Sequence, residues 1–310
     1  MVHVDLSVII ISFNTKKLLR GCLDSVYETI KGLNMEVFVV DNASTDGSPE
    51  MVEAFFPEVR LIRNTGNIGF AAANNIAISA SKGRYILLLN SDVVLRDRAV
   101  INLIDHLESH QEAAAAGPKV LNIDGSLQFK GFSFPSYSFA FAVLSGIGKI
   151  FNEKLLYRFL PHLFWDKDLA RVVDFVPGCC FLVRRGALDS VGLFSEEYFM
   201  YFEDADWCYR ARKKGYEVWY LPAAEIVHIG SASPSVRRSE LFANGMTLFY
   251  RKYTGLSKGI IIASLLTTAT AIAYARAFIK PRFLSEADLI KDELRKYLLL
   301  LRGLIHKGSR

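Results

Sequence analysis

Four short apolar runs alternate with four amphipathic segments over the first 109 residues, and this alternation constrains the fold more than any other feature. The apolar runs are short and rich in Val, Ile and Leu, so each predicts a buried strand: Leu6–Ile11, Glu36–Val40, Val59–Arg63 and Tyr85–Leu89. Helical spacing of apolar residues predicts a helix after each run: Thr15–Thr29, Ser48–Phe56, Gly69–Ser81 and Arg98–Ser109. Repeated strand–helix units of this kind indicate an α/β fold with a parallel sheet covered on both faces. Ligands of such sheets bind at the carboxyl ends of the strands.

The pattern after residue 120 is less regular. Two strands are expected within Val172–Val183, a helix within Phe199–Lys214, and two short strands at Glu217–Tyr220 and Glu225–Ile229. Between them lies an aromatic-rich stretch at 131–169 without clear periodicity. Its composition fits a lid, an acceptor-binding insertion or a patch that touches a membrane.

Composition excludes several classes of protein. The chain has 310 residues, of which 51% are hydrophobic and 22% charged, so it can bury a core and is not disordered. A net charge of +5 is too small to indicate a nucleic-acid-binding protein. The four cysteines show no CxxC or zinc-ligand spacing, and the N-terminus has the pattern of a strand and not of a signal peptide. A reducing, cytoplasmic compartment is therefore expected.

The last sixty residues differ from the rest, because residues 251–310 hold twelve Lys or Arg against four Asp or Glu. Residues 259–275 carry no charge, and a run of this length is borderline for a membrane-spanning helix. Leu284–His306 is amphipathic, with basic side chains beside a Leu-rich face. A basic, apolar tail favours an anionic membrane surface, so we predict peripheral attachment to the inner face of the cell membrane. A helical subdomain or a homo-oligomer interface is the alternative.

Small, polar and acidic residues follow the predicted strands at their carboxyl ends. Ser12, Phe13 and Asn14 follow the first strand, Asp41 the second, and Asn90-Ser91-Asp92 the fourth. Asp41 could accept a hydrogen bond from the N–H of a pyrimidine base, or it could cap the helix that follows. Asp92 could hold Mg²⁺ or Mn²⁺ through its carboxylate, or serve ordinary turn chemistry.

A second group of candidates lies near the end of the predicted body. Glu203, Asp204 and Asp206 mark the start of a helix, where acids are favoured by the positive end of the helix dipole. The functional interpretation is that one of these carboxylates is a general base, kept ionised by the helix terminus in an apolar cleft. His228 ends a predicted strand, either as a structural histidine or as a neutral ligand for a Mn²⁺-like ion.

Seven segments occur in an order that resembles the family 2 glycosyltransferases, and especially their rhamnosyltransferase-like branch. They are SVIIISFN, VVDNASTDGS, NTGNIGFAAANN, GRYILLLNSDV, PGCCFLVRR, GLFSEEYFMYFEDADWCYRARKKGY and VHIGSAS, and they cover about residues 4–232. The resemblance implies a GT-A fold, which is a Rossmann-like mixed sheet flanked by helices. It implies a glycosyltransferase domain at 1–250, with a nucleotide-binding half to about 120 and an acceptor half after it. The helical tail, a candidate membrane contact, then spans 251–310.

The resemblance also assigns roles to positions of this chain, by matching of the motifs. Nucleotide binding falls to Ser12, Phe13, Asn14, Asp41, Asn67, Gly69, Asn75 and Ser91. By the same matching, Asp92 and His228 would bind a divalent cation, Mg²⁺ or Mn²⁺. Asp204 would be the general base, with Glu203 beside it. Asn90 stands where the family has the first acid of its DxD motif, so one firm carboxylate remains for the metal.

The reaction implied is transfer of a sugar with inversion, from a nucleotide-diphosphate donor to a hydroxyl of a glycan or polyprenyl-linked acceptor. The donor would be dTDP-rhamnose or a UDP-sugar. The alternative is a sugar-nucleotide-binding or assembly protein of the same fold without transfer activity, and the intact Asp92 and Asp204 speak against it. A sugar-1-phosphate nucleotidyltransferase is disfavoured, because no Gly-rich phosphate loop follows the first predicted strand.

Overall fold

The computed structural model describes residues 4–129, 131–134, 166–230, 235–279 and 287–306. They form two compact units. The first comprises Met1–Phe132, Lys167–Phe199 and Glu203–Ser231, and the second Ser133–Asp166, Met200–Phe202 and Ala232–Arg310, so far as their residues are described. The aromatic-rich stretch predicted as a lid, insertion or membrane patch lies mostly outside the described residues.

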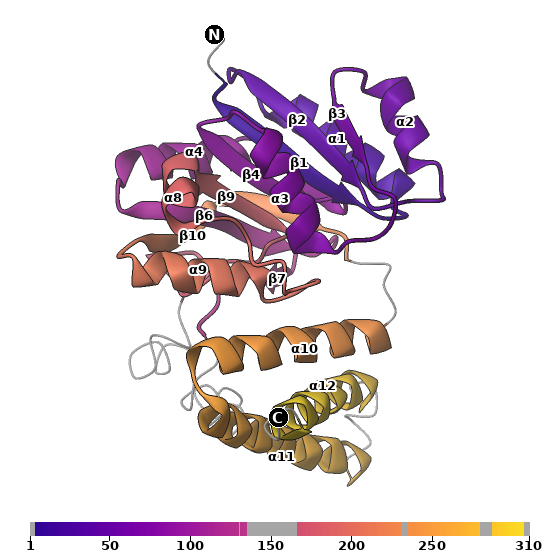
Figure 1. Cartoon of the computed structure of the whole chain (residues 1–310), viewed down its shortest axis with the longest axis vertical. Coiled ribbons are helices and arrows are strands. Elements are labelled where there is room, and N and C mark those ends of the chain that lie inside the picture. The colour runs from indigo at the N-terminus through magenta and orange to yellow at the C-terminus, as the bar shows by residue number, and fades with distance from the viewer. Residues whose placement is uncertain (1–3, 130, 135–165, 231–234, 280–286, 307–310) are drawn as a thin grey trace. The chain divides into compact units, whose positions relative to one another are not determined.

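The first unit is built on one mixed sheet (Figure 1). Its strands are β1 (Leu6–Ser12), β2 (Met35–Asp41), β3 (Arg60–Arg63), β4 (Tyr85–Asn90), β5 (Val93–Leu95), β6 (Ala113–Leu121), β7 (Leu127–Phe129), β8 (Arg171–Val172), β9 (Cys180–Arg184) and β10 (Glu217–His228). Its helices are α1 (Lys16–Thr29), α2 (Ser48–Phe55), α3 (Phe70–Ala80), α4 (Ala99–Ser109), α8 (Arg185–Val191) and α9 (Glu203–Lys213). The strand order is β3-β2-β1-β4-β9-β6-β10-β5, with β7 beside β6 and β8 beside β10.

The half of the sheet built by the first ninety residues is parallel, as the alternating pattern predicts. Strand β1 pairs with β2 on one side and with β4 on the other, and β2 pairs with β3, all in parallel. Because Ser12 pairs with Asp41 and Ile11 with Asn90, the three strands end together. The polar residues that follow them therefore share one edge of the sheet.

The other half is mixed, in agreement with the fold class that the resemblance implies. Strand β9 runs antiparallel to both β4 and β6. Strand β10 runs parallel to β6 and antiparallel to β5. The predicted pair of strands at Glu217–Tyr220 and Glu225–Ile229 is wrong in one respect: they form a single strand, β10, whose register shifts between Leu221 and Glu225.

The sequence pattern failed to predict β6, whose sequence is AAAAGPKVL. Alanine has the highest helix propensity, so this segment carries no local strand signal. It is a strand because it lies in the middle of the sheet, where close neighbours leave space only for small side chains. A Cβ atom added at Gly117 would lie 2.6 Å from Cβ of Val176, and Ala113 to Ala116 are fully buried.

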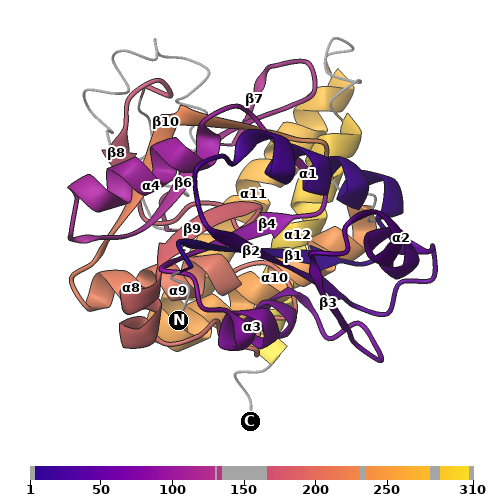
Figure 2. The same ribbon diagram turned by 90° about the horizontal axis from the view of Figure 1, so that it is seen from above.

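Helices cover both faces of this sheet (Figure 2). Helices α1 and α4 lie on one side, and α3, α8 and α9 on the other. The strands are consequently apolar on both faces: Val8 and Ile10 pack in the cluster that includes Leu19 and Leu23 of α1, whereas Ile9, between them in sequence, is buried on the opposite face. The core of the unit therefore lies in two layers, one above and one below the sheet.

The second unit contains α10 (Ser235–Tyr253), α11 (Leu256–Ile279) and α12 (Ala287–His306). The uncharged run at 259–275 lies within α11, and most of the predicted amphipathic segment forms α12. Glycines let these helices approach closely, since a Cβ atom at Gly303 of α12 would lie 3.0 Å from Oγ1 of Thr247 on α10. Among the described residues, every helix is too short or too polar to cross a bilayer.

Candidate active site

Asp41 ends β2 with its carboxylate almost fully buried. One oxygen, Oδ2, accepts a hydrogen bond from the backbone N–H of Ser44 at 2.8 Å. The other oxygen, Oδ1, is buried and has no hydrogen-bond partner among the described residues. Leaving a buried acceptor unsatisfied is costly, so this oxygen is suited to a donor from a bound ligand.

The loops after β1 and β2 are tied together around Asn14. Its backbone N–H donates to Oγ of Ser44 at 2.9 Å, and its side-chain oxygen accepts from the N–H of Thr45 at 2.8 Å. Asn14 has a left-handed backbone with φ of 55°, which asparagine tolerates better than most residues. The adjacent Phe13 is exposed at this edge, where its ring is free to meet a ligand.

A chain of hydroxyls joins β1 to the end of β4. Oγ of Ser12 lies 3.3 Å from Oγ1 of Thr15, which in turn donates to Oγ of Ser91 at 2.9 Å. Ser12 is fully buried and Ser91 nearly so. The structure thus brings Ser12, Asp41 and Ser91 to one end of the sheet, as the positions of the strand ends predict.

The loop before α3 is held by Asn42, which sequence analysis did not single out. Its Nδ2 donates to Oδ1 of Asn67 at 3.3 Å and to the carbonyl of Gly69 at 3.2 Å. Gly69 is left-handed, and a Cβ atom there would lie 2.5 Å from the carbonyl oxygen of Phe199. Only glycine fits this position. The loop is therefore fixed from two directions, by β2 and by the segment that precedes α9.

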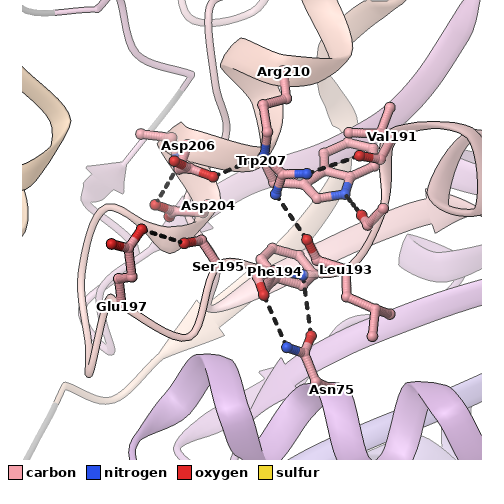
Figure 3. A network of polar contacts seen from close by, with 12 residues as sticks. Asn75, Val191, Leu193, Phe194, Ser195, Glu197, Asp204, Asp206, Trp207 and Arg210 are labelled. Carbon is pink, nitrogen blue, oxygen red and sulfur yellow. Dashed lines mark hydrogen bonds and ion pairs between the residues drawn. The ribbon is translucent and has the colours of Figure 1, made fainter. Parts of the chain in front are cut away.

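Asn75 lies apart from the other nucleotide-binding candidates, in the middle of α3 (Figure 3). Its Nδ2 donates to the carbonyl of Phe194 at 2.8 Å, and its Oδ1 accepts from the N–H of Phe194 at 3.1 Å. Nδ2 also donates to the carboxylate of Glu196 at 2.9 Å. Since both atoms of the amide are engaged within the protein, these contacts give Asn75 a role in joining α3 to the 192–199 segment.

Asp92 and His228 are distant in sequence but adjacent in the fold. Oδ1 of Asp92 lies 3.2 Å from Nε2 of His228, and the carbonyl of Asp92 accepts from the N–H of Ile229 at 2.9 Å. The antiparallel pairing of β5 with β10 places Val93 opposite His228 and so creates this pair. Both side chains are largely buried at the strand edge.

Gln128 of β7 orients the histidine, and sequence analysis missed it. Its Nε2 donates to the carbonyl of His228 at 3.1 Å and to Oδ1 of Asn122 at 2.7 Å. The remaining amide oxygen must then face Nδ1 of His228, which lies 2.5 Å away and carries the proton of that contact. With Nδ1 held by Gln128, the Nε2 edge of the ring faces Asp92, which is the orientation that a metal-binding histidine requires.

The side chains of Asp92 and His228 fit a divalent cation whose remaining ligands come from a bound substrate. Among the described residues, no group of three or more His, Cys, Asp or Glu side chains could hold a metal ion. Mg²⁺ is usually bound by one or two carboxylates together with substrate phosphates, and Mn²⁺ accepts both oxygen and imidazole ligands. The donor set of Asp92 and His228 meets that requirement, whereas a cage made of protein alone does not exist in the described part of the chain.

Asp204 lies in the first turn of α9 and is partly exposed. Its two oxygens accept hydrogen bonds from backbone N–H groups, Oδ2 from Gly178 at 2.8 Å and Oδ1 from Ala205 at 2.7 Å. Burial raises the pKa of Asp204 to about 6, although the N–H groups of Gly178 and Ala205 act in the opposite direction. A carboxylate of this kind is ionised at neutral pH and is a stronger base than an ordinary aspartate.

The other two acids of the cluster have different environments. Glu203 is 4% exposed, and its burial, followed by the charge of Asp204, raises its pKa well above the ordinary value. Both effects favour the protonated form of Glu203. Asp206 is fully buried and pairs with Arg210, whose Nε lies 2.9 Å from Oδ2 of Asp206. Of the three acids, only Asp204 combines partial exposure with an ionised carboxylate.

A short backbone path links the end of β4, near Asp92, to Asp204. The N–H of Asn90 donates to the carbonyl of Cys179 at 2.9 Å, and the preceding residue, Gly178, donates to Asp204. Cys179 lies near both carboxylates: burial, then the charges of Cys180, Asp92 and Asp204, raise the pKa of its thiol well above the ordinary value. The thiol stays protonated, so it is no nucleophile.

Comparisons with known proteins find matches over much of the chain. The pattern of "Glycosyl transferase family 2" matches residues 7–192, which is more than half of the chain. The chain is 30% identical over 213 residues to the "N-acetylglucosaminyl-diphospho-decaprenol L-rhamnosyltransferase" of Mycobacterium tuberculosis, covering 63% of this chain and 66% of that protein. It is also 30% identical over 174 residues to "Rhamnosyltransferase WbbL" of Escherichia coli, covering 53% and 61%. It thus matches slightly less than two thirds of each relative.

Solved structures show the same fold at low sequence identity. The "Mannosyltransferase PcManGT from Pyrobaculum calidifontis in complex with GDP-Man and Mn2+" superposes with a TM-score of 0.61 at 17% identity, over 97% of this chain and 88% of that one. The structure of TarS from S. aureus gives 0.55 at 18% identity, over 85% and 43%. With its mixed sheet, its strand-edge residues and the match over residues 7–192, the chain belongs to glycosyl transferase family 2.

Proposed function

We propose that the protein transfers a sugar from a nucleoside-diphosphate donor to an acceptor hydroxyl, with inversion at the anomeric carbon. The observation that carries this proposal is the pairing of Asp92 with His228 at the strand edge, joined through Asn90, Cys179 and Gly178 to the partly exposed Asp204. A cation site for a diphosphate and a general base for a hydroxyl are the two elements that direct displacement needs.

Asp92 and His228 would hold a divalent cation, Mg²⁺ or Mn²⁺, with Gln128 fixing the histidine. Such an ion, when bound, stabilises the negative charge that develops on the departing diphosphate. The single carboxylate, with Asn90 in the place of a second one, leaves several coordination positions to the diphosphate and water. Metal affinity should therefore depend strongly on whether nucleotide is present.

Asp204 would take the proton of the acceptor hydroxyl as that oxygen attacks the anomeric carbon. Attack from the face opposite the diphosphate breaks the bond to the leaving oxygen in the same step and inverts the configuration. Glu203 is 4% exposed, so an acceptor hydroxyl reaches it less readily than Asp204, and Asp206 pairs with Arg210. The mechanism requires no enzyme nucleophile, which agrees with the buried, protonated thiols of the four cysteines.

The donor would lie along the edge formed by β1, β2 and β4. The buried, unpartnered Oδ1 of Asp41 suits the ring N–H of uracil or thymine, beside the exposed ring of Phe13. Ser12, Asn14, Asn67, Gly69 and Ser91 would line the rest of the nucleotide site. The two rhamnosyltransferase relatives make dTDP-rhamnose the first donor to test, followed by UDP-sugars.

The test is a screen of nucleotide-sugars for protein-dependent release of nucleoside diphosphate, with and without Mn²⁺. A panel of dTDP-, UDP- and GDP-sugars, with simple glycosides and a polyprenyl-diphosphate sugar as acceptors, covers the proposal. Release that depends on Mn²⁺ and on one donor is expected. Tight nucleotide binding without release or transfer from any donor would instead point to a binding or assembly protein.

We further propose that the acceptor is lipid-linked and that the second unit binds an anionic membrane surface. On α12 the exposed residues Lys291, Arg295, Leu298, Arg302 and Ile305 are spaced by four, three, four and three positions, so they form one stripe. This stripe carries three basic and two apolar side chains, a combination that suits an interfacial helix. On α11, which packs with α12, Ile261 and Ile272 are exposed and lie on one face.

A flotation assay with the full chain tests this attachment. Vesicles of phosphatidylcholine with 30% phosphatidylglycerol, about one anionic lipid in three, should carry the protein upward at low salt, and pure phosphatidylcholine should not. The triple variant K291Q/R295Q/R302Q should lose binding, whereas the matched control K17Q/K31Q/K82Q, with exposed lysines of the first unit, should keep it. Equal behaviour of both variants would overturn the attachment. A concentration-dependent dimer without flotation would make the stripe an oligomer interface.

A further inference from the structure

The backbone that leads from the end of α8 toward α9 accepts more hydrogen bonds from side chains than a connecting segment requires. Four consecutive carbonyl oxygens, those of Val191 to Phe194, each accept a hydrogen bond from a side chain (Figure 3). The donors, in order, are Arg210 Nη1 at 2.9 Å, Trp207 Nε1 at 2.9 Å, Arg210 Nη2 at 2.8 Å and Asn75 Nδ2 at 2.8 Å. Carbonyls of connecting segments commonly bond to water, so this segment is fixed much more firmly.

Arg210 is the centre of this arrangement. Its Nε donates to the fully buried carboxylate of Asp206 at 2.9 Å, while Nη1 and Nη2 reach the carbonyls of Val191 and Leu193. All three guanidinium nitrogens are therefore used at once, in the planar fork geometry that lysine cannot reproduce. Asp206 lies on the same helix one turn earlier, so Arg210 joins α9 to the segment beside it.

Trp207 and Asn75 complete the frame. The indole of Trp207 is fully buried and meets Phe181 of β9 edge-on, with ring centroids 5.6 Å apart, and it stacks on Phe194 at 6.1 Å. Asn75 binds both backbone groups of Phe194 from α3. Helix α9 is thus fixed against β9, the 191–194 segment and, through that segment, α3.

We infer that Arg210 is a positioning residue for Asp204: by joining Asp206 to the carbonyls of Val191 and Leu193, it sets the rotation of α9 and hence the direction of the Asp204 carboxylate. Asn75 supports the same frame from α3. This inference rests on the proposed function, because it takes Asp204 to be the general base. It goes beyond that function by assigning a catalytic consequence to residues that do not touch substrate.

The physical link runs along one helix. Asp204 lies six residues before Arg210, and its carboxylate must point so as to meet the N–H of Gly178. A small rotation of α9 moves the carboxylate off this contact and into water. Misplacement of a reacting group by about 1 Å reduces turnover by up to about a hundredfold.

The test compares two Arg-to-Lys substitutions on the same helix. Arg210→Lys keeps the positive charge beside Asp206 but loses the fork, and we expect kcat to fall about 10- to 100-fold. Binding of dTDP or UDP should change less than about twofold, because the nucleotide edge is built by other strands. Arg212→Lys is the control: Arg212 pairs with Asp174 and binds none of the four carbonyls, so kcat should change less than about twofold.

The pH dependence of kcat/KM distinguishes a loss of positioning of Asp204 from a general loosening of the protein. The titratable and charged groups around Asp204 are the buried Glu203, the Asp206–Arg210 pair and the buried thiols of Cys179 and Cys208. Burial is the largest cause of the shift at Asp204, so hydration is the main variable. In the wild type, kcat/KM should fall below about pH 6 as Asp204 is protonated. In Arg210→Lys the carboxylate gains water, so the midpoint should move to lower pH, toward the ordinary value of an aspartate.

Hydrogen exchange supplies a readout that needs no substrate. The amides of Gly178 and Ala205 both donate to Asp204, so they should exchange faster in Arg210→Lys and at the wild-type rate in Arg212→Lys.

If the wild type transfers no sugar, the proposed function fails, but the exchange rates still show whether Arg210 positions Asp204. The inference is overturned if Arg210→Lys has the same turnover and exchange rates as Arg212→Lys. It is also overturned if Arg210→Lys loses nucleotide binding as much as it loses turnover. Should Arg210→Lys fail to fold, Asn75→Ser takes its place, with the same readouts and the same expected outcomes.

Discussion

The two halves of the sheet differ in how they are built. Strands β3, β2, β1 and β4 come from the first ninety residues, run parallel, and are joined by a helix at each step. Strands β9, β6, β10 and β5 come from distant parts of the chain and pair in both directions. The first half holds the candidate nucleotide-binding residues, whereas Asp204, His228 and Gln128 depend on the second. Donor binding and chemistry should therefore respond to different mutations.

Asp204→Asn should show the largest difference between the two halves, because it should reduce turnover and leave donor binding intact. Loss of a general base costs about two orders of magnitude in turnover or more, while binding of dTDP or UDP should survive because it depends on the parallel half. Turnover is measured by release of nucleoside diphosphate, and binding by calorimetry. The matched control is Asp189→Asn, an exposed acid on α8, which should be near-native. Near-native turnover of Asp204→Asn would end the assignment of the base.

Asp92→Ala should break the connection between the halves, because Asp92 ends the parallel half but pairs with His228 of the mixed half. We expect binding of nucleoside diphosphate in the presence of Mn²⁺ to weaken about 10- to 100-fold, and activity to vanish. In excess chelator, wild type and variant should bind the nucleotide equally weakly. Full activity of the wild type in chelator would contradict the cation site.

Gln128→Leu tests the mixed half alone. Removing the acceptor of the Nδ1 proton frees the imidazole to change tautomer and orientation, so the Mn²⁺ concentration for half-maximal activity should rise about tenfold. Gln128→Glu retains an acceptor at the same place and is the matched control, with a smaller effect expected. Identical Mn²⁺ dependence in both variants would show that the histidine is not oriented by Gln128.

The smallest expected effect is on stability, through the pKa of Asp204. Because burial raises this pKa to about 6 in the folded protein, the folded state binds more protons than the unfolded state between about pH 4 and pH 6. Its contribution to stability is present at low pH and is lost as the pH rises through 6. Between pH 4.5 and pH 7.5 the wild type should lose about 2 kcal/mol more than Asp204→Asn, measured by urea unfolding. Parallel pH dependences would contradict the raised pKa.

The sequence by itself was sufficient for the parallel half. Each of β1 to β4 is an apolar run, and a helix follows each of β1 to β3, so local periodicity and chain order imply the elements and their parallel direction. The polar residues after these strands then had to share one edge, which brought Ser12, Asp41 and Asp92 together in the prediction. The sequence also singled out the acids at the start of the predicted helix and His228, and the family resemblance assigned roles to Asp204 and His228.

Only the tertiary structure decided the rest, because it depends on neighbours that are distant in sequence. Strand β6 is alanine-rich and has no local strand signal, and β10 continues through a shift in register that divides its pattern in two. Gln128 follows no motif, yet the pairing of β7 with β6 brings it to His228. Asn75 and Arg210 show the same limit: an asparagine on an Ala-rich helix and an arginine near a helix end carry no signal of their own until the fold places both on one stretch of backbone.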